Sequence, residues 1–286
     1  MKIAFAGLGV MGAPMARHLV AAGHDVAGFN RTIAKAEAWA AATGGEAAAT
    51  IGEAAQGAEL LLLCVGDDDD VRAVVTEALP HLAAGAVIVD HTTTSAKLAR
   101  EMAELAKGRG RRFVDAPVSG GQAGAENGQL SVMAGGDADA LARAEPALKA
   151  YSKAIKHMGP AGSGQLTKMV NQIAIAGVVQ GLAEAVHFAQ TAGLDTDAVY
   201  EAVSKGAAQS WQMDNRWKTA ARGEFDFGFA VDWMRKDLGL VLDEGRSNGA
   251  KLALTALVDQ FYADVQDMGG NRWDTSSLAA RLQRRD

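Results

Sequence analysis

The sequence predicts an α/β domain with a doubly wound, mostly parallel sheet, followed by an all-α domain. Its 286 residues correspond to about two domains of ordinary size. In the first half, short β-rich runs alternate with alanine-rich helical stretches, as in a parallel sheet covered by helices. After Gly162 only helical periodicity is present, so we expect domains at residues 1–162 and 163–286.

The strands of the first domain are expected in short apolar runs bounded by turn residues. These runs are Lys2–Ala6, Asp25–Phe29, Leu60–Val65, Val87–Asp90, Arg112–Asp115, Leu130–Ala134 and Ala154–His157. Helices are expected at Met11–Ala22, Thr32–Ala42, Asp68–Leu79 and Ser95–Gly108. Thr32 and Ser95 stand where N-caps would. The acidic run Asp67–Asp70 suits the positive end of a helix, and we interpret it as a solvated helix start rather than a cation site.

The second domain is expected to begin with one long helix, Ser163–Thr191, that joins it to the first. This helix is apolar, but it contains several polar residues, which argue against a membrane span and predict a helix buried in a soluble protein. They are Asn171, Gln172, Gln180, Glu184 and His187. At the N-terminus, glycines at 7, 9 and 12 interrupt the apolar run, so a strand is expected there rather than a signal peptide.

Composition narrows the classes of function. A net charge of -6 provides no overall basic field, which argues against nucleic acid as the main partner. The single cysteine, Cys64, lies in an apolar run; it is expected to be a small buried hydrophobe in a protein of the reducing cytoplasm. The six histidines show no metal-ligand spacing, so no protein-ligated metal is expected.

The first strand runs directly into a G-x-G-x-x-G motif and then a helix. In such a motif the first glycine makes the turn, the second lets the main chain approach a pyrophosphate, and the third permits close helix–strand packing. The helix N-terminus faces the anion. Because strand and helix flank the motif in the right order, it predicts dinucleotide binding. The expected contacts are Gly7, Leu8, Gly9, Val10, Met11 and Gly12.

The end of the second predicted strand indicates which dinucleotide is bound. An acidic residue here would accept a hydrogen bond from the ribose 2′-OH of NAD, whereas this chain has Asn30, Arg31 and Thr32, with Lys35 a helical turn further on. A guanidinium matches a 2′-phosphate bidentately, so NADP is predicted in preference to NAD. The alternative is that Arg31 is a solvated surface residue. Val65, after the third apolar run, is a further expected cofactor contact.

A loop of small residues, 115–124, follows the fifth predicted strand, at the sheet edge where open α/β sheets bind ligands. The amides of Gly120 and Gly121 and the hydroxyl of Ser119 could form a donor set for a carboxylate. An ordinary glycine-rich turn would explain the glycines equally well.

Two lysines are candidates for chemistry. Lys168 shares one face of the long helix with Asn171 and Gln172, at i+3 and i+4. In a cleft, desolvation would lower its pKa from about 10.4 toward the range of a general acid/base, but it could equally snorkel to solvent. Lys236 shares a helical face with Trp233 and could project beside this aromatic ring, or it could lie on the polar edge of an ordinary amphipathic helix.

Four segments in order carry a family resemblance. They are Gly7-Leu-Gly-Val-Met-Gly-Ala-Pro-Met-Ala16, Asp115-Ala-Pro-Val-Ser-Gly-Gly121, Gly162-Ser-Gly-Gln-Leu-Thr-Lys-Met-Val-Asn-Gln172 and Lys236-Asp-Leu238. Together they resemble the β-hydroxyacid dehydrogenases, which include 3-hydroxyisobutyrate dehydrogenase and the tartronate, succinic and glyoxylate semialdehyde-type reductases. The resemblance implies a Rossmann domain, a helical domain, dimers or tetramers, and an active site in the cleft between domains.

The resemblance also implies residue roles. Ser119, Gly120 and Gly121 would bind the substrate carboxylate, and Lys168 would be the general acid/base. The remaining implied contacts are Asn171, Gln172 and Lys236 with substrate or cofactor, Asp237 behind them, and Thr93 near the nicotinamide. Two departures from the family pattern are Gln172, where many members have Asn, and His91-Thr92, where Met-Ser is common. These could alter substrate shape, as could Trp211, Met213 and Trp233, which are expected to line the pocket.

The sequence thus predicts reversible hydride transfer between NADP and a small β-hydroxyacid or semialdehyde. One alternative is an NADPH-dependent reductase of imines or non-acid carbonyls on the same scaffold, which Lys168 argues against because imine-reducing relatives commonly place another residue there. A second alternative is a non-catalytic nucleotide-sensing module, which would leave Lys168 and the Ser119–Gly121 loop without a purpose.

Overall fold

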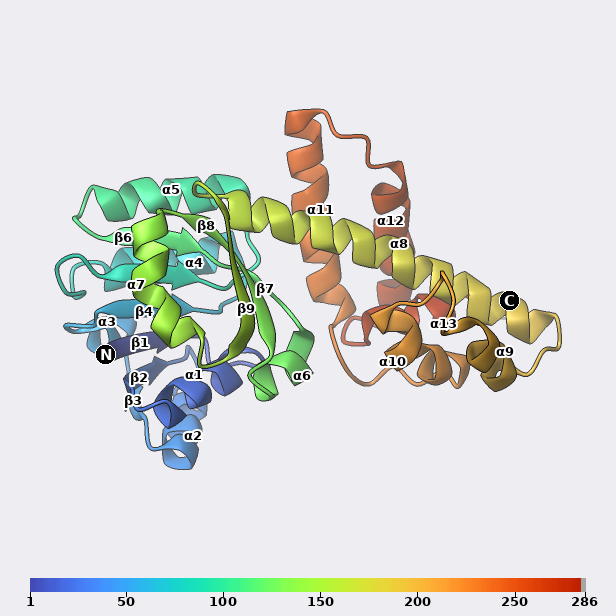
Figure 1. The fold of residues 1–286 in the computed structure, drawn as a ribbon, viewed down its shortest axis with the longest axis horizontal. Helices are drawn as coiled ribbons and strands as arrows, with labels where there is room; N and C mark the ends of the chain where they lie inside the picture. Colours follow the sequence, from blue (N-terminus) through green and yellow to red (C-terminus); the bar gives the residue numbers. More distant parts are fainter. Residues whose placement is uncertain (284–286) are drawn as a thin grey trace. The chain divides into compact units, whose positions relative to one another are not determined.

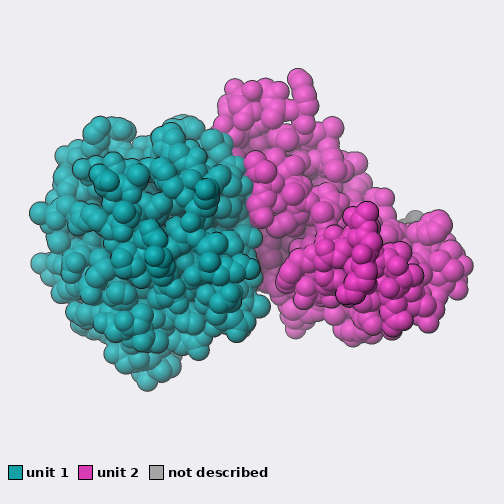
Figure 2. Space-filling view, in the orientation of Figure 1, with its two compact units in different colours: residues 1–168 teal, residues 169–286 magenta. Residues whose placement is uncertain are grey.

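The computed structural model describes residues 1–283 of the chain. It divides into two compact units, residues 1–168 and residues 169–286 (Figure 2). The division falls inside one continuous helix, α8 (Ser163–Thr191).

Unit 1 is built on a nine-stranded sheet (Figure 1). Its strands are β1 (Lys2–Ala6), β2 (Asp25–Phe29), β3 (Glu46–Ala48), β4 (Leu60–Leu63), β5 (Val87–Asp90), β6 (Arg112–Asp115), β7 (Val118–Ser119), β8 (Leu130–Gly136) and β9 (Ser152–Gly159). The spatial order is β3-β2-β1-β4-β5-β6-β8-β7, with β9 beside β8. All pairings are parallel except those of β8 with β6 and β7. This confirms the mostly parallel, doubly wound sheet.

The order of strands places β1 between β2 and β4, with Ala4 opposite Ala27 on one side and Leu61 on the other. The chain therefore progresses in one direction from β1 to β3 and in the opposite direction from β4 to β6. At such a reversal, the carboxyl ends of the strands border a crevice where open α/β sheets bind ligands. The glycine motif follows β1 at this edge.

Helices cover both faces of the sheet. They are α1 (Gly12–Ala21), α2 (Ile33–Thr43), α3 (Ile51–Ala55), α4 (Asp68–Ala78), α5 (Ala96–Lys107), α6 (Gly121–Glu126) and α7 (Ala138–Leu148). Because side chains alternate along a strand, Ile3 and Phe5 of β1 join a core with α1, α2 and α7. Ala4 and Ala6 join a second core with α3, α4 and α5. Burial on both faces explains why these strands are apolar throughout.

All seven predicted strands and four predicted helices of this unit are present, with ends shifted by no more than two residues. The prediction omitted β3, β7, α3, α6 and α7. Residues 115–124, expected as a loop of small residues, contain β7 and most of α6 instead. Ser95 caps α5 by accepting from the Leu98 amide, and Asp67 caps α4. Thr32 makes no side-chain cap, because the Lys35 amide bonds its carbonyl oxygen instead.

In its described part, residues 169–283, unit 2 is built from helices joined by loops, with one isolated antiparallel bridge between Ala230 and Asp274. Besides the continuation of α8, it contains α9 (Thr196–Val203), α10 (Trp211–Ala221), α11 (Val231–Asn248), α12 (Ala253–Asp267), a 3-10 turn (Thr275–Ser277) and α13 (Leu278–Gln283). Its core packs Ala176 and Val179 of α8 against Met234 and Leu238 of α11 and Tyr262 of α12. The predicted helical domain is confirmed.

One face of α8 is exposed, contrary to the expectation of a buried helix. Its exposed residues include a set spaced by three or four positions, which we call the α8 stripe: Val170, Ala174, Val178, Gly181, Ala185 and Phe188. Polar residues of the helix, Glu184 and Gln190 among them, are exposed as well. Leu254 and Leu257 of α12 are also exposed, and Leu254 approaches α8 at Gly177. By length and composition α8 could cross a membrane, the single such helix in the described chain, and 39% of its most apolar window is buried.

Candidate active site

The glycine motif after β1 has two glycines that packing requires and one that it does not. Gly7 has φ +94°, and a β-carbon there would overlap the carbonyl oxygen of Cys64. A β-carbon at Gly12 would overlap the carbonyl oxygen of Gly7. At Gly9, by contrast, a β-carbon would meet no atom within 4 Å. The fold therefore leaves open space in front of Gly9, as a main chain that approaches a pyrophosphate requires.

Asn30, after β2, braces this turn. Its side-chain Oδ1 accepts a hydrogen bond from the Leu8 amide at 3.2 Å, and its Nδ2 donates to the carbonyl oxygen of Thr32. The Gly7 amide donates to the carbonyl oxygen of Phe29. Asn30 thus holds the end of β2 to the glycine turn. The sequence predicted a contact with the cofactor for this residue and did not predict this structural role.

Arg31 projects from the same strand end, and its side chain is 80% exposed. It forms an ion pair with Asp70 of α4 at 2.9 Å. Asp70 is held in place because its other carboxylate oxygen accepts from the Gly66 amide at 3.1 Å. Lys35 is exposed on α2. The structure therefore brings Arg31 and Lys35 to the carboxyl end of β2. It also places the carboxylate of Asp70 there, a residue that the sequence predicted only as part of a solvated helix start.

The predicted carboxylate-binding residues lie where β7 ends and α6 begins. Ser119 pairs with Ser131 of β8. Gly120 and Gly121 both have positive φ, +133° and +61°, a conformation that glycine adopts without strain. A β-carbon at Gly121 would meet no atom within 4 Å, so space is open beside this main chain, as it is at Gly9.

The start of α8 is anchored to the sheet by Asp115 at the end of β6. One of its carboxylate oxygens accepts from the Gly162 amide at 2.8 Å, and the other accepts from the Gln165 amide at 2.9 Å. Burial raises the pKa of Asp115, and these amides oppose the rise by stabilising the charged form. Asp115 is therefore the N-terminal anchor of the helix that carries Lys168.

Lys168 lies one turn further along α8 and is 9% exposed, so it does not reach solvent as a snorkelling surface lysine would. Asn171 and Gln172 follow on the same helical face, and Gln172 is buried. The structure thus confirms that the helix presents these three side chains on one face.

In unit 2 the amides of Asn171 and Gln172 form a chain of hydrogen bonds that ends on Asp237 of α11. The Asn171 amide donates to Gln172 Oε1 at 2.8 Å, and Gln172 Nε2 donates to Asp237 Oδ2 at 2.7 Å. The other Asp237 oxygen lies 3.3 Å from Lys236 Nζ. Lys236 Nζ also lies 5.7 Å from the centre of the Trp233 ring, which confirms the predicted position beside an aromatic side chain. The amides, Asp237 and Lys236 therefore form one continuous polar chain.

The other expected pocket residues are less closely connected. Trp211, at the start of α10, is 57% exposed, and its ring lies 5.2 Å from the Arg216 guanidinium. Met213 is buried in a small core with Val186 and Trp217, so the structure gives no support for a place in the pocket wall.

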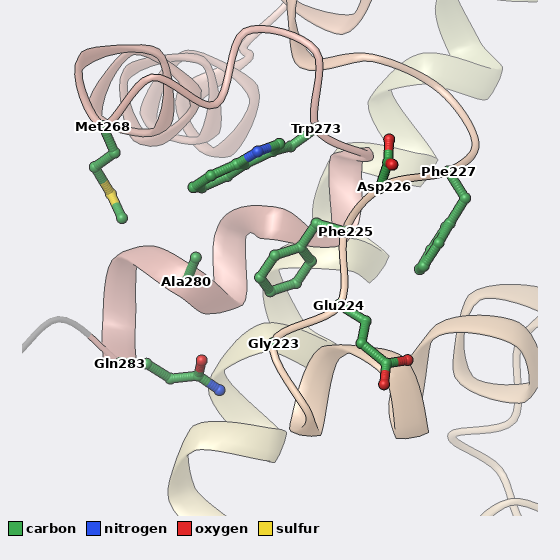
Figure 3. Close-up of a pocket in the computed structure, with 9 residues that line it drawn as sticks. All are labelled: Gly223, Glu224, Phe225, Asp226, Phe227, Met268, Trp273, Ala280 and Gln283. Carbon is green, nitrogen blue, oxygen red and sulfur yellow. The ribbon is translucent and has the colours of Figure 1, made fainter.

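Unit 2 also contains an open apolar hollow (Figure 3) that none of the predicted site residues lines. Phe225, Phe227, Trp273, Met268 and Ala280 surround it, with Glu224, Asp226 and Gln283 at its edges. Within residues 1–283, no group of three or more His, Cys, Asp or Glu side chains is placed to hold a metal ion.

Two buried side chains, His91 and Gln165, make hydrogen bonds that the sequence did not predict. His91, expected to influence substrate shape, is buried instead: its Nδ1 lies 2.7 Å from the Ala116 carbonyl oxygen and its Nε2 2.8 Å from the Tyr151 hydroxyl. Gln165 bonds the loop after β5. Both are polar residues in apolar surroundings, a signal that could have identified them as packed against specific partners.

Comparisons with known proteins identify the family of each domain. The NAD binding domain of 6-phosphogluconate dehydrogenase matches residues 2–159. Residues 162–282 match a second family model, which is described as NAD-binding of NADP-dependent 3-hydroxyisobutyrate dehydrogenase. The chain therefore has an NAD(P)-binding domain of the Rossmann type and a helical domain of known family.

Similar whole proteins give the same result. An uncharacterised oxidoreductase of Shewanella frigidimarina is 60% identical, over 99% of this chain and 98% of its own. A probable 3-hydroxyisobutyrate dehydrogenase-like protein of Arabidopsis thaliana is 39% identical, over 99% and 85%. The solved 3-hydroxyisobutyrate dehydrogenase of Mycobacterium tuberculosis, with L-serine, has a TM-score of 0.90, 33% identity and 99% coverage of both chains. Sequence motifs, fold and relatives thus agree that the chain is an oxidoreductase of the β-hydroxyacid dehydrogenase family.

Proposed function

We propose that the protein is an NADP-dependent oxidoreductase that transfers a hydride between the nicotinamide and a β-hydroxyacid or its semialdehyde. The proposal rests above all on Lys168, a buried lysine on the amide-bearing face of a helix whose first turn Asp115 anchors. Burying a charged ammonium group costs free energy unless the group is paired or hydrogen-bonded. At this position it is suited to act as general acid/base.

The names of the relatives support the substrate class. 3-Hydroxyisobutyrate, named for the Arabidopsis and Mycobacterium proteins, and L-serine, present with the latter, share a hydroxymethyl group on the carbon that bears the carboxylate. They differ in having a methyl or an ammonium group on that carbon. We propose that this chain acts on a small compound of this kind. Tartronate semialdehyde has the same plan in its oxidised form, whereas the other candidates, succinic semialdehyde and glyoxylate, place the carbonyl group one carbon further from the carboxylate and one carbon nearer to it, respectively.

The nucleotide would be held by the chain ends of β1, β2 and β4. The open space at Gly9 fits a pyrophosphate, and the basic end of β2 fits a 2′-phosphate, with Arg31 as its bidentate partner. This favours NADP over NAD. When bound, NADP supplies the redox chemistry, because its nicotinamide gives or accepts the hydride.

The chain's own residues would bind, orient and exchange a proton. The amides of Gly120 and Gly121 and the Ser119 hydroxyl hold the substrate carboxylate, which fixes the position of the carbinol carbon. During oxidation Lys168 Nζ takes the hydroxyl proton, and during reduction it returns that proton to the carbonyl oxygen. Asn171, oriented through Gln172 and Asp237, bonds the substrate oxygen, and Lys236 contributes positive charge.

We also propose that the protein works in the cytoplasm as a homodimer or a larger homo-oligomer. The α8 stripe, together with Leu254 and Leu257, presents apolar side chains at helical spacing to solvent, and Phe188 is 70% exposed. Several large apolar side chains exposed along one helix are typical of a surface that makes protein–protein contact. Closed symmetric self-association is the commonest form of such contact.

The decisive experiment compares NADPH and NADH oxidation by the wild type and Lys168→Ala, with a panel of semialdehydes, glyoxylate and a cyclic imine. We expect acid-selective turnover that prefers NADPH and falls by at least about a hundredfold in the variant, since a positioned acid/base contributes that much. Lys153→Ala, on the exposed face of β9, is the matched control and should retain activity. If Lys168→Ala stays active, or only the imine is reduced, the imine reductase alternative replaces this proposal.

A further inference from the structure

Gln165, one turn before Lys168, makes two side-chain hydrogen bonds to a distant loop. Its Nε2 donates to the carbonyl oxygen of Thr92 at 2.8 Å, and its Oε1 accepts from the amide of Thr94 at 3.0 Å. The side chain is fully buried. These two peptide groups flank Thr93, so one amide clamps both sides of that residue in the loop after β5.

The same residue also belongs to the anchor of α8. Its main-chain amide donates to Asp115. In the loop after β5, the Thr92 hydroxyl accepts a hydrogen bond from the amide of Val65, which lies two residues after the end of β4. Three strand ends, those of β4, β5 and β6, are therefore tied to the first turn of α8. Asp115 bonds the main chain at the helix start, whereas the side chain of Gln165 adds a separate connection to the Thr93 loop.

The partners fix what this side chain must be. A carbonyl oxygen can only accept and an amide N–H can only donate, so the group at 165 has to offer one donor and one acceptor. A carboxamide does so, and so does a protonated carboxylic acid. A carboxylate cannot, because it would place an unpaired negative oxygen against the Thr92 carbonyl.

We propose that Gln165 is a positioning residue that sets the distance between Thr93 and Lys168. The inference rests on the proposed function, in which Thr93 borders the nicotinamide and Lys168 exchanges the substrate proton. Hydride transfer requires the nicotinamide beside Thr93 to be positioned correctly, and proton transfer requires the same of Lys168. The distance between Thr93 and Lys168 depends on the two hydrogen bonds of Gln165. Loss of these bonds should therefore lower kcat rather than weaken the binding of substrate or nucleotide.

Gln165→Met, which keeps length and removes both hydrogen bonds, tests this directly. We expect kcat to fall about tenfold to hundredfold, the cost of a misplacement of about 1 Å, with KM for substrate and NADPH little changed. Gln180→Met is the matched control: Gln180 is a buried amide on the same helix, 4% exposed, bonded to Glu184. It should retain wild-type kcat.

Gln165→Glu provides a readout that general destabilisation would not give. Burial raises the pKa of a carboxyl group, so Glu at this position should gain a proton, and with it the missing donor, as the pH is lowered across the range in which the wild type is active. We expect kcat of this variant, relative to wild type at each pH, to rise as the pH falls. A flat ratio would overturn the proposal.

Amide hydrogen exchange without added nucleotide tests the clamp apart from catalysis. The Thr94 amide should exchange faster in Gln165→Met than in wild type or Gln180→Met. Unchanged exchange at Thr94, or a loss of activity that lies in KM with kcat preserved, would overturn the assignment. If Lys168→Ala remained active while Thr94 exchange increased as expected, the proposed function would fail but the structural connection would stand.

Discussion

At the scale of single residues, cofactor preference depends on what Arg31 is bonded to. Its guanidinium is paired with Asp70, and a 2′-phosphate at Arg31 would have to share or displace that carboxylate. An exposed pair of this kind contributes at most about 1 kcal/mol. The carboxylate also repels a phosphate through space, so Asp70 is expected to limit the affinity for NADPH.

We therefore predict that Asp70→Asn lowers the KM for NADPH about two- to fivefold, the equivalent of at most about 1 kcal/mol, and leaves the KM for NADH unchanged. The asparagine keeps an acceptor for the Gly66 amide. Asp69→Asn is the matched control, because Asp69 pairs with Arg72 instead and the charge change is the same. If both variants lowered the KM for NADPH equally, the cause would be the general loss of negative charge near the nucleotide. If Asp70→Asn raised the KM for NADPH, the role of Asp70 would be to orient Arg31.

His91 is a buried group whose protonation opposes folding. The Ala116 carbonyl can only accept, so Nδ1 carries the proton and Nε2 accepts from the Tyr151 hydroxyl. Burial lowers the pKa of His91 to about 4. In the unfolded chain the pKa is about 6.5. Between these two values the unfolded chain binds a proton that the folded chain does not, so stability falls as the pH falls from about 6.5 to about 4.

The expected loss is about 3 kcal/mol over that window, from the pKa difference at 1.36 kcal/mol per unit. Urea unfolding of wild type and His91→Met at several pH values measures it. The variant should show a shallower decline than wild type below pH 6.5, whatever its stability at pH 7. His157→Met, at an exposed histidine, should decline as wild type does. Parallel curves for wild type and His91→Met would contradict the buried neutral histidine.

At the scale of elements, the turn between β1 and α1 contains one glycine that nucleotide binding would require and another that folding requires. A β-carbon at Gly9 has room within the protein, whereas one at Gly12 overlaps the carbonyl oxygen of Gly7. We predict that Gly9→Ala keeps the wild-type melting temperature and raises the dissociation constant for NADPH at least about tenfold, about 1.4 kcal/mol. Gly12→Ala should lower the melting temperature. Fluorescence titration and thermal melts distinguish them, and tight NADPH binding by Gly9→Ala would rule out a nucleotide at this turn.

Elements were predictable from the sequence where local pattern and tertiary packing agree. Strands buried on both faces, such as Leu60–Leu63, are continuous apolar runs. The strand Glu46–Ala48 has no β-branched or aromatic residue and exists because it pairs with β2. Helix α7 contains Pro146, a residue that usually interrupts a helix, and so its sequence signal is weak.

The same distinction applies to the site. Lys168, Asn171 and Gln172 could be placed on one face because helical spacing is a local property. The partners of Gln165 are 71 and 73 residues away, and those of Asp115 are 47 and 50 residues away. No local pattern encodes contacts at such separations. The shared helical face of the three proposed site residues was therefore predictable, and the residues that hold the helix and the loops in place were not.

At the scale of the whole molecule, the exposed α8 stripe makes self-association testable. Its apolar residues recur at helical spacing on a helix whose other face is in the core. Leaving such a surface in water forgoes about 25 cal/mol for each Å² that a partner could cover. A second copy of the chain offers the same apolar surface, and two such surfaces can bury one another about a twofold axis.

We predict that Val178→Glu shifts the protein to a smaller species in sedimentation velocity, because a buried carboxylate at the centre of the stripe has no partner. Val203→Glu, the same change at an exposed valine of α9 outside the stripe, should sediment as wild type. Circular dichroism should show both variants folded, since both side chains are already accessible to water. If wild type and Val178→Glu both sediment as the same oligomer, the contact lies on another surface; if both are monomers, the exposed stripe has no second copy of the chain as its partner.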